Sequence, residues 1–165
     1  MTDSSDASGM DLATLISHAY GSVNLSVPST GVPEVPEGLE SLEGKDILLV
    51  DDSTDVFAAF IPPLVAATGG SARFLRHTDE TQEELVGLVM GFQPAVVLLD
   101  GELGNGVLGM AVARELKEKG SDARCIGFSS SRGTREEFLQ AGAESFVLKS
   151  AHDPWGTLRE VAGIL

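Results

Sequence analysis

The stretches ILLVDD (residues 47–52) and AVVLLD (residues 95–100) decide the fold of this chain. Each is a short apolar run that stops at acidic side chains, which is typical of a strand buried on both faces of a parallel sheet. Because parallel strands end at the same edge of a sheet, we expect Asp51, Asp52 and Asp100 to meet there. Three carboxylates held together repel one another unless a cation lies among them, so the pattern indicates a divalent-metal site.

An apolar run followed by a helical pattern repeats five times from Lys45 onward. Such alternation indicates an α/β fold, a doubly wound five-stranded parallel sheet with helices on both faces. Pro62 and Pro63 conflict with the first helix and should kink or interrupt it. The predicted strands span residues 46–50, 72–76, 94–99, 123–128 and 144–148, and the predicted helices span 54–68, 79–91, 107–119, 132–141 and 154–164.

Composition limits the class of protein. The chain has 165 residues, 42% of them hydrophobic, which suits one compact domain with a sizeable core. The net charge of −14 argues against nucleic-acid binding, which needs clustered Lys and Arg. No signal sequence or membrane-spanning run is visible, so we expect a cytoplasmic protein without a membrane partner. The single cysteine, Cys125, lies in an apolar run and is expected to be a buried thiol.

Residues 1–44 differ from the rest of the chain. They carry seven acidic residues and no Lys or Arg, with Pro28, Pro33 and Pro36 among Ser, Gly and Glu. We predict an N-terminal extension that is largely disordered or linker, with helical spacing for one short helix over residues 11–20. A disordered tail, a docking segment and a cap folded over the domain all stay open. The folded domain is expected to span residues 45–165.

Polar side chains also follow two of the later strands. Ser129 follows the fourth strand and Lys149 the fifth, whereas the second strand contributes no comparable group. Ligands of open parallel sheets bind beyond the carboxyl ends of the strands, where these side chains should gather with the three acids. His77 and His152 have no metal-ligand spacing with each other, and His18 lacks a helical-bundle context for phosphotransfer.

These motifs resemble the receiver domain of bacterial two-component response regulators. The resemblance covers about residues 45–165 and implies a flavodoxin-like (β/α)5 fold with strand order 2-1-3-4-5. One motif alone would be weak, but all of them occur in the family's order and approximate spacing. They are ILLVDD (47–52), VVLLDGELG (96–104), GFSS (127–130) and AGAESFVLK (141–149).

The resemblance implies a metal and a nucleophile for the acidic residues. Asp100 would be the phosphoacceptor, a carboxylate that forms an acyl phosphate. Asp52 and Asp100 would bind Mg²⁺ directly, and Asp51 through water. The backbone carbonyl of Glu102 would supply a further oxygen.

The resemblance also implies roles for the residues that follow the last two strands. The Lys149 ammonium would neutralise charge on the transferring phosphoryl group. Ser129 would donate its hydroxyl to a phosphoryl oxygen, and Phe146 would be the switch aromatic that moves inward with Ser129.

Two loops depart from the family's pattern. Ser150 replaces the proline that usually follows the lysine, so the Lys149–Ser150 peptide could be cis or trans. Gly104 replaces another usual proline in the loop after Asp100, which also contains Gly101 and Gly106 and is therefore unusually flexible.

We therefore expect a phosphoacceptor signalling switch of a phosphorelay, a stand-alone receiver without an output domain and not a turnover enzyme. Its partners would be a sensor histidine kinase or histidine phosphotransfer protein and an unknown output protein, with a homodimer left open. One alternative is a pseudo-receiver that acts as a dimerisation or scaffold module without phosphorylation. The other alternative is an aspartate-nucleophile phosphatase, which needs a second acid two residues after the nucleophile. Ser53 occupies that position after Asp51, which argues against Asp51 as the nucleophile. Glu102 occupies it after Asp100, so this alternative stays open there.

Overall fold

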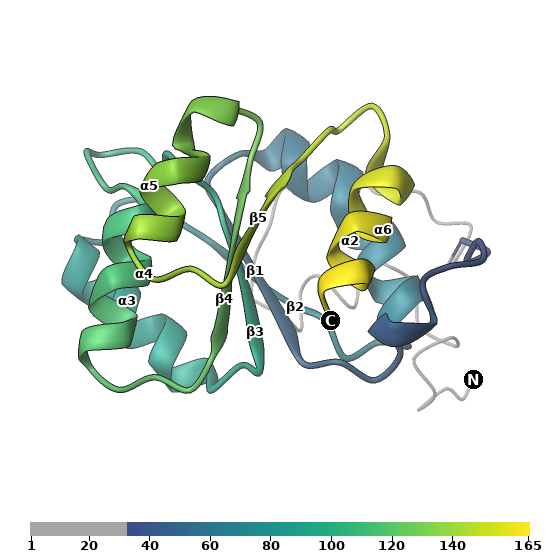
Figure 1. The fold of residues 1–165 in the computed structure, drawn as a ribbon, viewed down its shortest axis with the longest axis horizontal. Coiled ribbons are helices and arrows are strands. Elements are labelled where there is room, and N and C mark those ends of the chain that lie inside the picture. The colour runs from purple at the N-terminus through teal and green to yellow at the C-terminus, as the bar shows by residue number, and fades with distance from the viewer. Residues whose placement is uncertain (1–32) are drawn as a thin grey trace.

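Five parallel strands form a central sheet with a layer of helices on each face (Figure 1). The structure is a computed structural model that describes residues 33–165, so the helix expected over residues 11–20 lies outside the described residues. The strand order is β2-β1-β3-β4-β5, which confirms the predicted fold class and topology. The strands are β1 (Ile47–Asp51), β2 (Arg73–Arg76), β3 (Val96–Leu99), β4 (Arg124–Ser129) and β5 (Ser145–Leu148).

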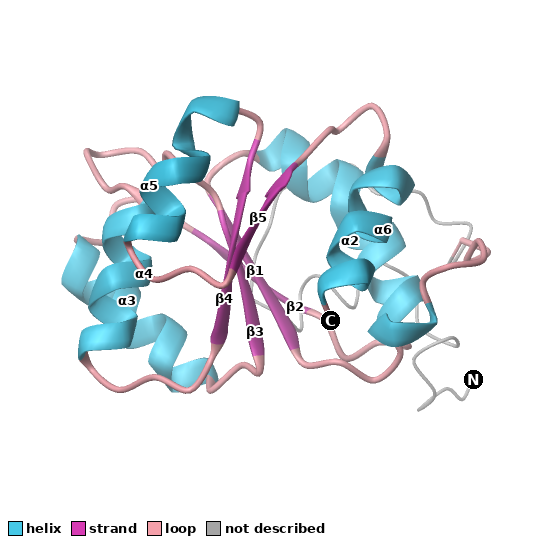
Figure 2. Cartoon of the chain, viewed as in Figure 1, coloured by secondary structure: helices cyan, strands magenta, loops and turns pink. Residues whose placement is uncertain are grey.

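The helices divide between the two faces of the sheet (Figure 2). Successive residues of each strand point to opposite faces, so Ile47 and Leu49 pack in one apolar core while Leu48 and Val50 pack in the other. The first core lies under α2, α6 and η2, and the second under α3, α4 and α5. The helices are η2 (Glu40–Leu42), α2 (Thr54–Thr68), α3 (Gln82–Phe92), α4 (Gly109–Glu118), η3 (Arg132–Thr134), α5 (Arg135–Gln140) and α6 (Pro154–Ile164).

Capping side chains set where several helices begin. Ser53 accepts a hydrogen bond from the Val56 N–H and caps α2. Thr81 and Glu84 form a reciprocal capping box that starts α3 three residues later than the sequence predicted. Asp153 caps α6, and Pro154 takes the first helical position.

The predicted interruption of the first helix at its two prolines is wrong. α2 runs as one element through Pro62 and Pro63. The prolines remove two backbone donors, but Phe57, Phe60 and Leu64 on the same helix are fully buried in the core. Burial of this apolar face stabilises the helix more than the two missing hydrogen bonds weaken it.

The described part of the N-terminal extension packs on the domain. Leu39 and Leu42 are buried in the core shared with α2 and α6. The Ser41 hydroxyl donates to the Ala162 carbonyl over 2.8 Å, and the Gly44 N–H donates to the Thr68 carbonyl over 3.0 Å. Of the roles left open for residues 1–44, these residues fit a cap over the helix ends; the domain boundary at residue 45 stays a prediction.

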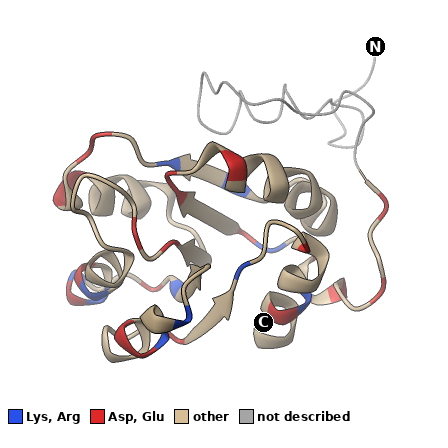
Figure 3. Ribbon diagram, turned by 90° about the horizontal axis from the view of Figure 1, so that it is seen from above, with Lys and Arg blue, Asp and Glu red and all other residues tan. Residues whose placement is uncertain are grey.

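Acidic residues lie on loops and helices around the sheet, in keeping with the net charge of −14 (Figure 3). Cys125 is buried in β4, as the apolar run predicted, and its burial raises the pKa of the thiol to about 11. No helix among the described residues is long and apolar enough to cross a membrane.

Candidate functional site

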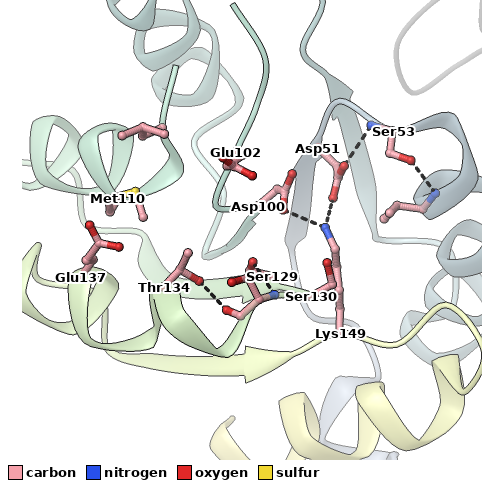
Figure 4. A pocket seen from close by; sticks show the side chains of 13 residues that line it. Asp51, Ser53, Asp100, Glu102, Met110, Ser129, Ser130, Thr134, Glu137 and Lys149 are labelled. Carbon is pink, nitrogen blue, oxygen red and sulfur yellow. Dashed lines mark hydrogen bonds and ion pairs between the residues drawn. The ribbon is translucent and has the colours of Figure 1, made fainter. Parts of the chain in front are cut away.

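Four strands deliver a polar side chain to one cavity at the carboxyl edge of the sheet (Figure 4). Asp51 ends β1, Asp100 directly follows β3, Ser129 ends β4 and Lys149 directly follows β5. The cavity has a volume of about 410 Å³. Because β1 lies between β2 and β3, its end is also where the strand order reverses, the usual ligand position in open α/β sheets.

The Lys149 ammonium lies between two carboxylates. Its Nζ is 2.5 Å from Asp51 Oδ2 and 2.9 Å from Asp100 Oδ1 (Figure 4). The Lys149 backbone N–H donates to the Ser129 carbonyl over 2.9 Å, which fixes the start of this side chain at the end of β4. Lys149 is buried, so its charge is compensated by these carboxylates more than by solvent.

The carboxylate of Asp51 already has protein donors on both oxygens. Its Oδ1 accepts from the backbone N–H groups of Asp52 (2.8 Å) and Ser53 (3.0 Å), and its Oδ2 accepts from Lys149. Asp51 is fully buried, and this burial raises its pKa, although the charge of Lys149 opposes the shift. With both oxygens engaged, Asp51 is better suited to hold a metal through water than directly.

Asp100 keeps one oxygen free. Its Oδ1 accepts from Lys149 and from the Gly101 N–H over 2.9 Å, whereas Oδ2 has no hydrogen-bond donor within residues 33–165. Burial and the negative charge of Asp51 raise the pKa of Asp100 to about 6, against the effect of Lys149. At neutral pH the carboxylate is therefore ionised and one of its oxygens faces the cavity.

The donor set fits a hard divalent cation. Asp51, Asp52 and Asp100 each offer a carboxylate oxygen, and these oxygens lie within 4.8 Å of one another. Oxygen donors of this kind are the ligands that Mg²⁺ prefers. A Cβ on Gly104, which has a φ of +87°, would lie 3.3 Å from Asp52 Oδ2, so a glycine lets the loop pass close to this acid.

Of the two predicted switch residues, Ser129 lines the cavity, whereas Phe146 is not among its lining residues. Ser129 is buried, and its hydroxyl accepts from the Ser131 N–H over 3.1 Å. Phe146 is buried against Phe138, with ring centroids 6.0 Å apart. A Cβ on Gly127 would lie 2.6 Å from Phe138 Cγ and 2.9 Å from Phe146 Cδ1, so the glycine makes room for both rings.

The structure brings the predicted residues together and adds others. Lys149–Ser150 is trans, as are all the described peptide bonds. Glu102 lines the cavity, but a role for its backbone carbonyl in metal binding stays a prediction. The apolar part of the lining could not be predicted, since nothing in the sequence distinguishes these side chains from core residues: Val56, Leu108 and Met110.

No family model and no curated protein matches this chain. Its structure is similar to that of the response regulator TrrA from Thermotoga maritima in complex with Mg²⁺-BeF, at 26% identity and a TM-score of 0.57, over 73% of this chain and 99% of TrrA. It is similar to the BeF₃-activated receiver domain of DrrB, at 22% identity and a TM-score of 0.54, over 72% and 94% of the two chains.

A third similar structure is a LuxR-family DNA-binding response regulator from Staphylococcus aureus, at 21% identity and a TM-score of 0.51, over 71% of this chain and 98% of that one. In each case nearly the whole of the other chain is matched. Together with the strand order and the acidic cluster at the carboxyl edge, these similarities show that the chain has the fold of a response-regulator receiver domain.

Proposed function

We propose that this chain is a phosphoacceptor signalling switch in which Asp100 takes up a phosphoryl group in the presence of Mg²⁺. One observation carries the proposal: Lys149 contacts Asp51 and Asp100 together, and Asp100 Oδ2, inside a cluster of three carboxylates, has no donor among residues 33–165. A purely structural ion pair would not need the third acid or the open cavity.

The free oxygen of Asp100 is the nucleophile. A bond forms between Asp100 Oδ2 and the phosphorus of a phosphohistidine on the donor protein, and the phosphorus–nitrogen bond breaks. The electron pair of the broken bond stays on the donor nitrogen, which takes up a proton from solvent. The donor would be a sensor histidine kinase or a histidine phosphotransfer protein.

The surrounding residues neutralise the charge of the phosphoryl group. Asp52, Asp100 and the Glu102 carbonyl would hold Mg²⁺, with Asp51 acting through water. Bound there, the ion supplies positive charge beside the phosphoryl oxygens. Lys149 supplies the second positive charge from the protein side, since its ammonium already lies 2.9 Å from Asp100.

The signal would leave the site through Ser129 and Phe146. The Ser129 hydroxyl would turn from the Ser131 N–H to a phosphoryl oxygen, and Phe146 would repack beside it. An output protein would read this change on the surface formed by α5, β5 and α6. The coupling requires that the output protein bind the two phosphorylation states with different affinity.

Labelling by a small phosphodonor tests the proposal. We expect acetyl phosphate with Mg²⁺ to add one phosphoryl group to the wild type, detected by intact mass, and Asp100→Asn to abolish it. Asp122→Asn, an exposed acid outside the cavity, is the matched control and should label normally. Absence of labelling in the wild type would refute the proposal and favour a pseudo-receiver, whereas turnover of phosphoesters would favour a phosphatase.

A further inference from the structure

The loop that follows Asp100 has a backbone that is costly to hold in one conformation. Gly104, Asn105 and Gly106 have successive positive φ values of +87°, +52° and +76°. Hydrogen bonds inside this β3–α4 loop (residues 100–108), such as Val107 N–H to the Gly104 carbonyl over 2.9 Å, give it a shape, and the side chains of Leu103 and Val107 are buried in the core. Apolar packing does not set the direction of a carbonyl group, so a glycine-rich backbone needs a polar attachment to keep its carbonyls oriented.

His77 supplies such an attachment from the end of β2. Its side chain is fully buried, its Nδ1 is hydrogen-bonded to the Leu103 carbonyl, and its Nε2 lies 2.7 Å from the Glu80 carbonyl. Its backbone N–H donates to the Asp51 carbonyl over 2.8 Å. One residue therefore joins the end of β1, the loop before α3 and the loop after Asp100.

Both edges of the imidazole ring face carbonyl oxygens. Carbonyl oxygens only accept, so the tautomer with its proton on Nδ1 donates to the Leu103 carbonyl, and only the imidazolium form donates from both ring nitrogens. A carboxylate oxygen of Glu80 lies 4.0 Å from Nε2 and faces the same edge. Asn105 adds a second, exposed attachment, since its Nδ2 donates to the Thr78 carbonyl over 3.0 Å.

The attachment lies one peptide unit beyond the predicted metal-binding carbonyl. The Glu102 carbonyl and the Leu103 N–H belong to one peptide unit, and this N–H donates to the Val107 carbonyl over 3.0 Å. The next carbonyl along the chain, that of Leu103, is the one hydrogen-bonded to His77. Fixing Leu103 on both sides also fixes the direction of the Glu102 carbonyl.

We propose that His77 is a positioning residue of the metal site, which holds the β3–α4 loop so that the Glu102 carbonyl points at the cation. This inference rests on the proposed function, because it concerns the Mg²⁺ site of the phosphoacceptor. His77 does not touch the cation or the phosphoryl group; it acts through Leu103.

The test combines hydrogen exchange without metal and Mg²⁺ titration. His77→Phe keeps a ring of similar shape but removes both hydrogen-bonding nitrogens. We expect faster amide exchange at Leu103 and Val107 in the metal-free protein, with exchange at Val50 in β1 unchanged. Calorimetric titration should show Mg²⁺ affinity falling about 10- to 100-fold, the usual effect of losing a residue that orients a metal ligand.

Matched variants separate positioning from general damage. His152→Phe changes an exposed histidine outside the cavity and should alter neither measurement. His77→Gln restores one donor and should recover part of the Mg²⁺ affinity; it also serves as the test variant if His77→Phe does not fold.

Two results would overturn the inference: unchanged exchange at Leu103 in the variants, or faster exchange there without a loss of Mg²⁺ affinity. If the wild type itself bound no Mg²⁺, the proposed function would fail first and the positioning role with it. The exchange data would still show whether His77 holds the loop.

Discussion

The charged groups at one end of the sheet are partly exposed to water, and those at the other end are buried. At the amino ends of the strands, Arg73 pairs with Asp46 over 2.7 Å, and Arg124 pairs with Glu144. These side chains are between 34% and 41% exposed, so water screens each pair. At the carboxyl ends, Asp51, Asp100 and Lys149 are buried around one cavity.

The difference shows which charges contribute little to stability and which reduce it. The amino-end pairs replace water with a partner at little net gain. The carboxyl-end charges are desolvated, and this raises the pKa of both Asp51 and Asp100 in spite of Lys149. Apolar side chains in their place would stabilise the fold at least as well, so we expect the use of these two acids to lie in ligand binding.

Removing Lys149 should have the largest effect on the free energy of unfolding. Lys149→Met leaves two buried carboxylates without their cation, and we expect the free energy of unfolding to fall by about 3 kcal/mol at pH 8 in urea titrations without Mg²⁺. The loss should shrink at pH 5, where Asp100 binds a proton in the folded state. Lys119→Met is the control, because the exposed Lys119 pairs with the half-buried Glu115 over 3.3 Å; equal losses in both variants would contradict the comparison.

Neutralising Asp100 should raise the free energy of unfolding of the metal-free protein. The pKa of Asp100 is raised from its usual 3.8 to about 6, which corresponds to at most about 3 kcal/mol of destabilisation when the group is ionised. Asp100→Asn should therefore stabilise the metal-free protein at pH 8. Because a raised pKa favours the protonated folded state, the wild type gains stability as the pH falls from about 6 to 4, and the advantage of the variant should disappear over that range.

Thermal unfolding across this pH range would measure the effect. A variant that is equally stabilised at pH 8 and pH 4 would show that burial of the Asp100 charge is not the cause. Asp122→Asn serves again as the exposed control and should leave the pH profile unchanged.

Removing the Thr157 hydroxyl, which holds the loop after Lys149, should have a smaller effect on the free energy of unfolding. The buried Thr157 Oγ1 accepts from the Ser150 N–H over 3.0 Å and lies 3.0 Å from the Asp153 carbonyl. Thr157→Val should leave the Ser150 N–H without a partner and lower the free energy of unfolding by about 1–2 kcal/mol in urea titrations. Thr78→Val, on an exposed side chain, should change it by less than about 0.5 kcal/mol.

The amino-end pair between Arg124 and Glu144 should have the smallest effect. A double-mutant cycle with Arg124→Ala and Glu144→Ala should give a coupling of less than about 1 kcal/mol that decreases with added salt. The cycle is needed because Arg124 also donates to the Ile164 carbonyl over 3.2 Å. A coupling as large as the effect of Lys149→Met would remove the distinction between the two ends.

The sequence predicted the strands and the acids well because both depend on local patterns. An apolar run that stops at Asp51 or Asp100 already places the carboxylate at the edge of a parallel sheet. The packing of Leu39 and Leu42 could not be predicted, because they lie among Pro, Glu and Gly and find their partners on helices far along the chain. His77 was missed for a similar reason: its hydrogen-bond partners are backbone carbonyls, which leave no mark in the sequence.

The buried thiol has a practical consequence for testing the proposed switch in solution. Thiols react as thiolates, and Cys125, the single cysteine of the chain, has a pKa of about 11 and little access to solvent. A cysteine introduced on the exposed face of α5 or α6 would therefore react with maleimide dyes or spin labels far faster than the native one. Labelling of Cys125 itself should therefore be slow, and a reporter can be attached without replacing this residue.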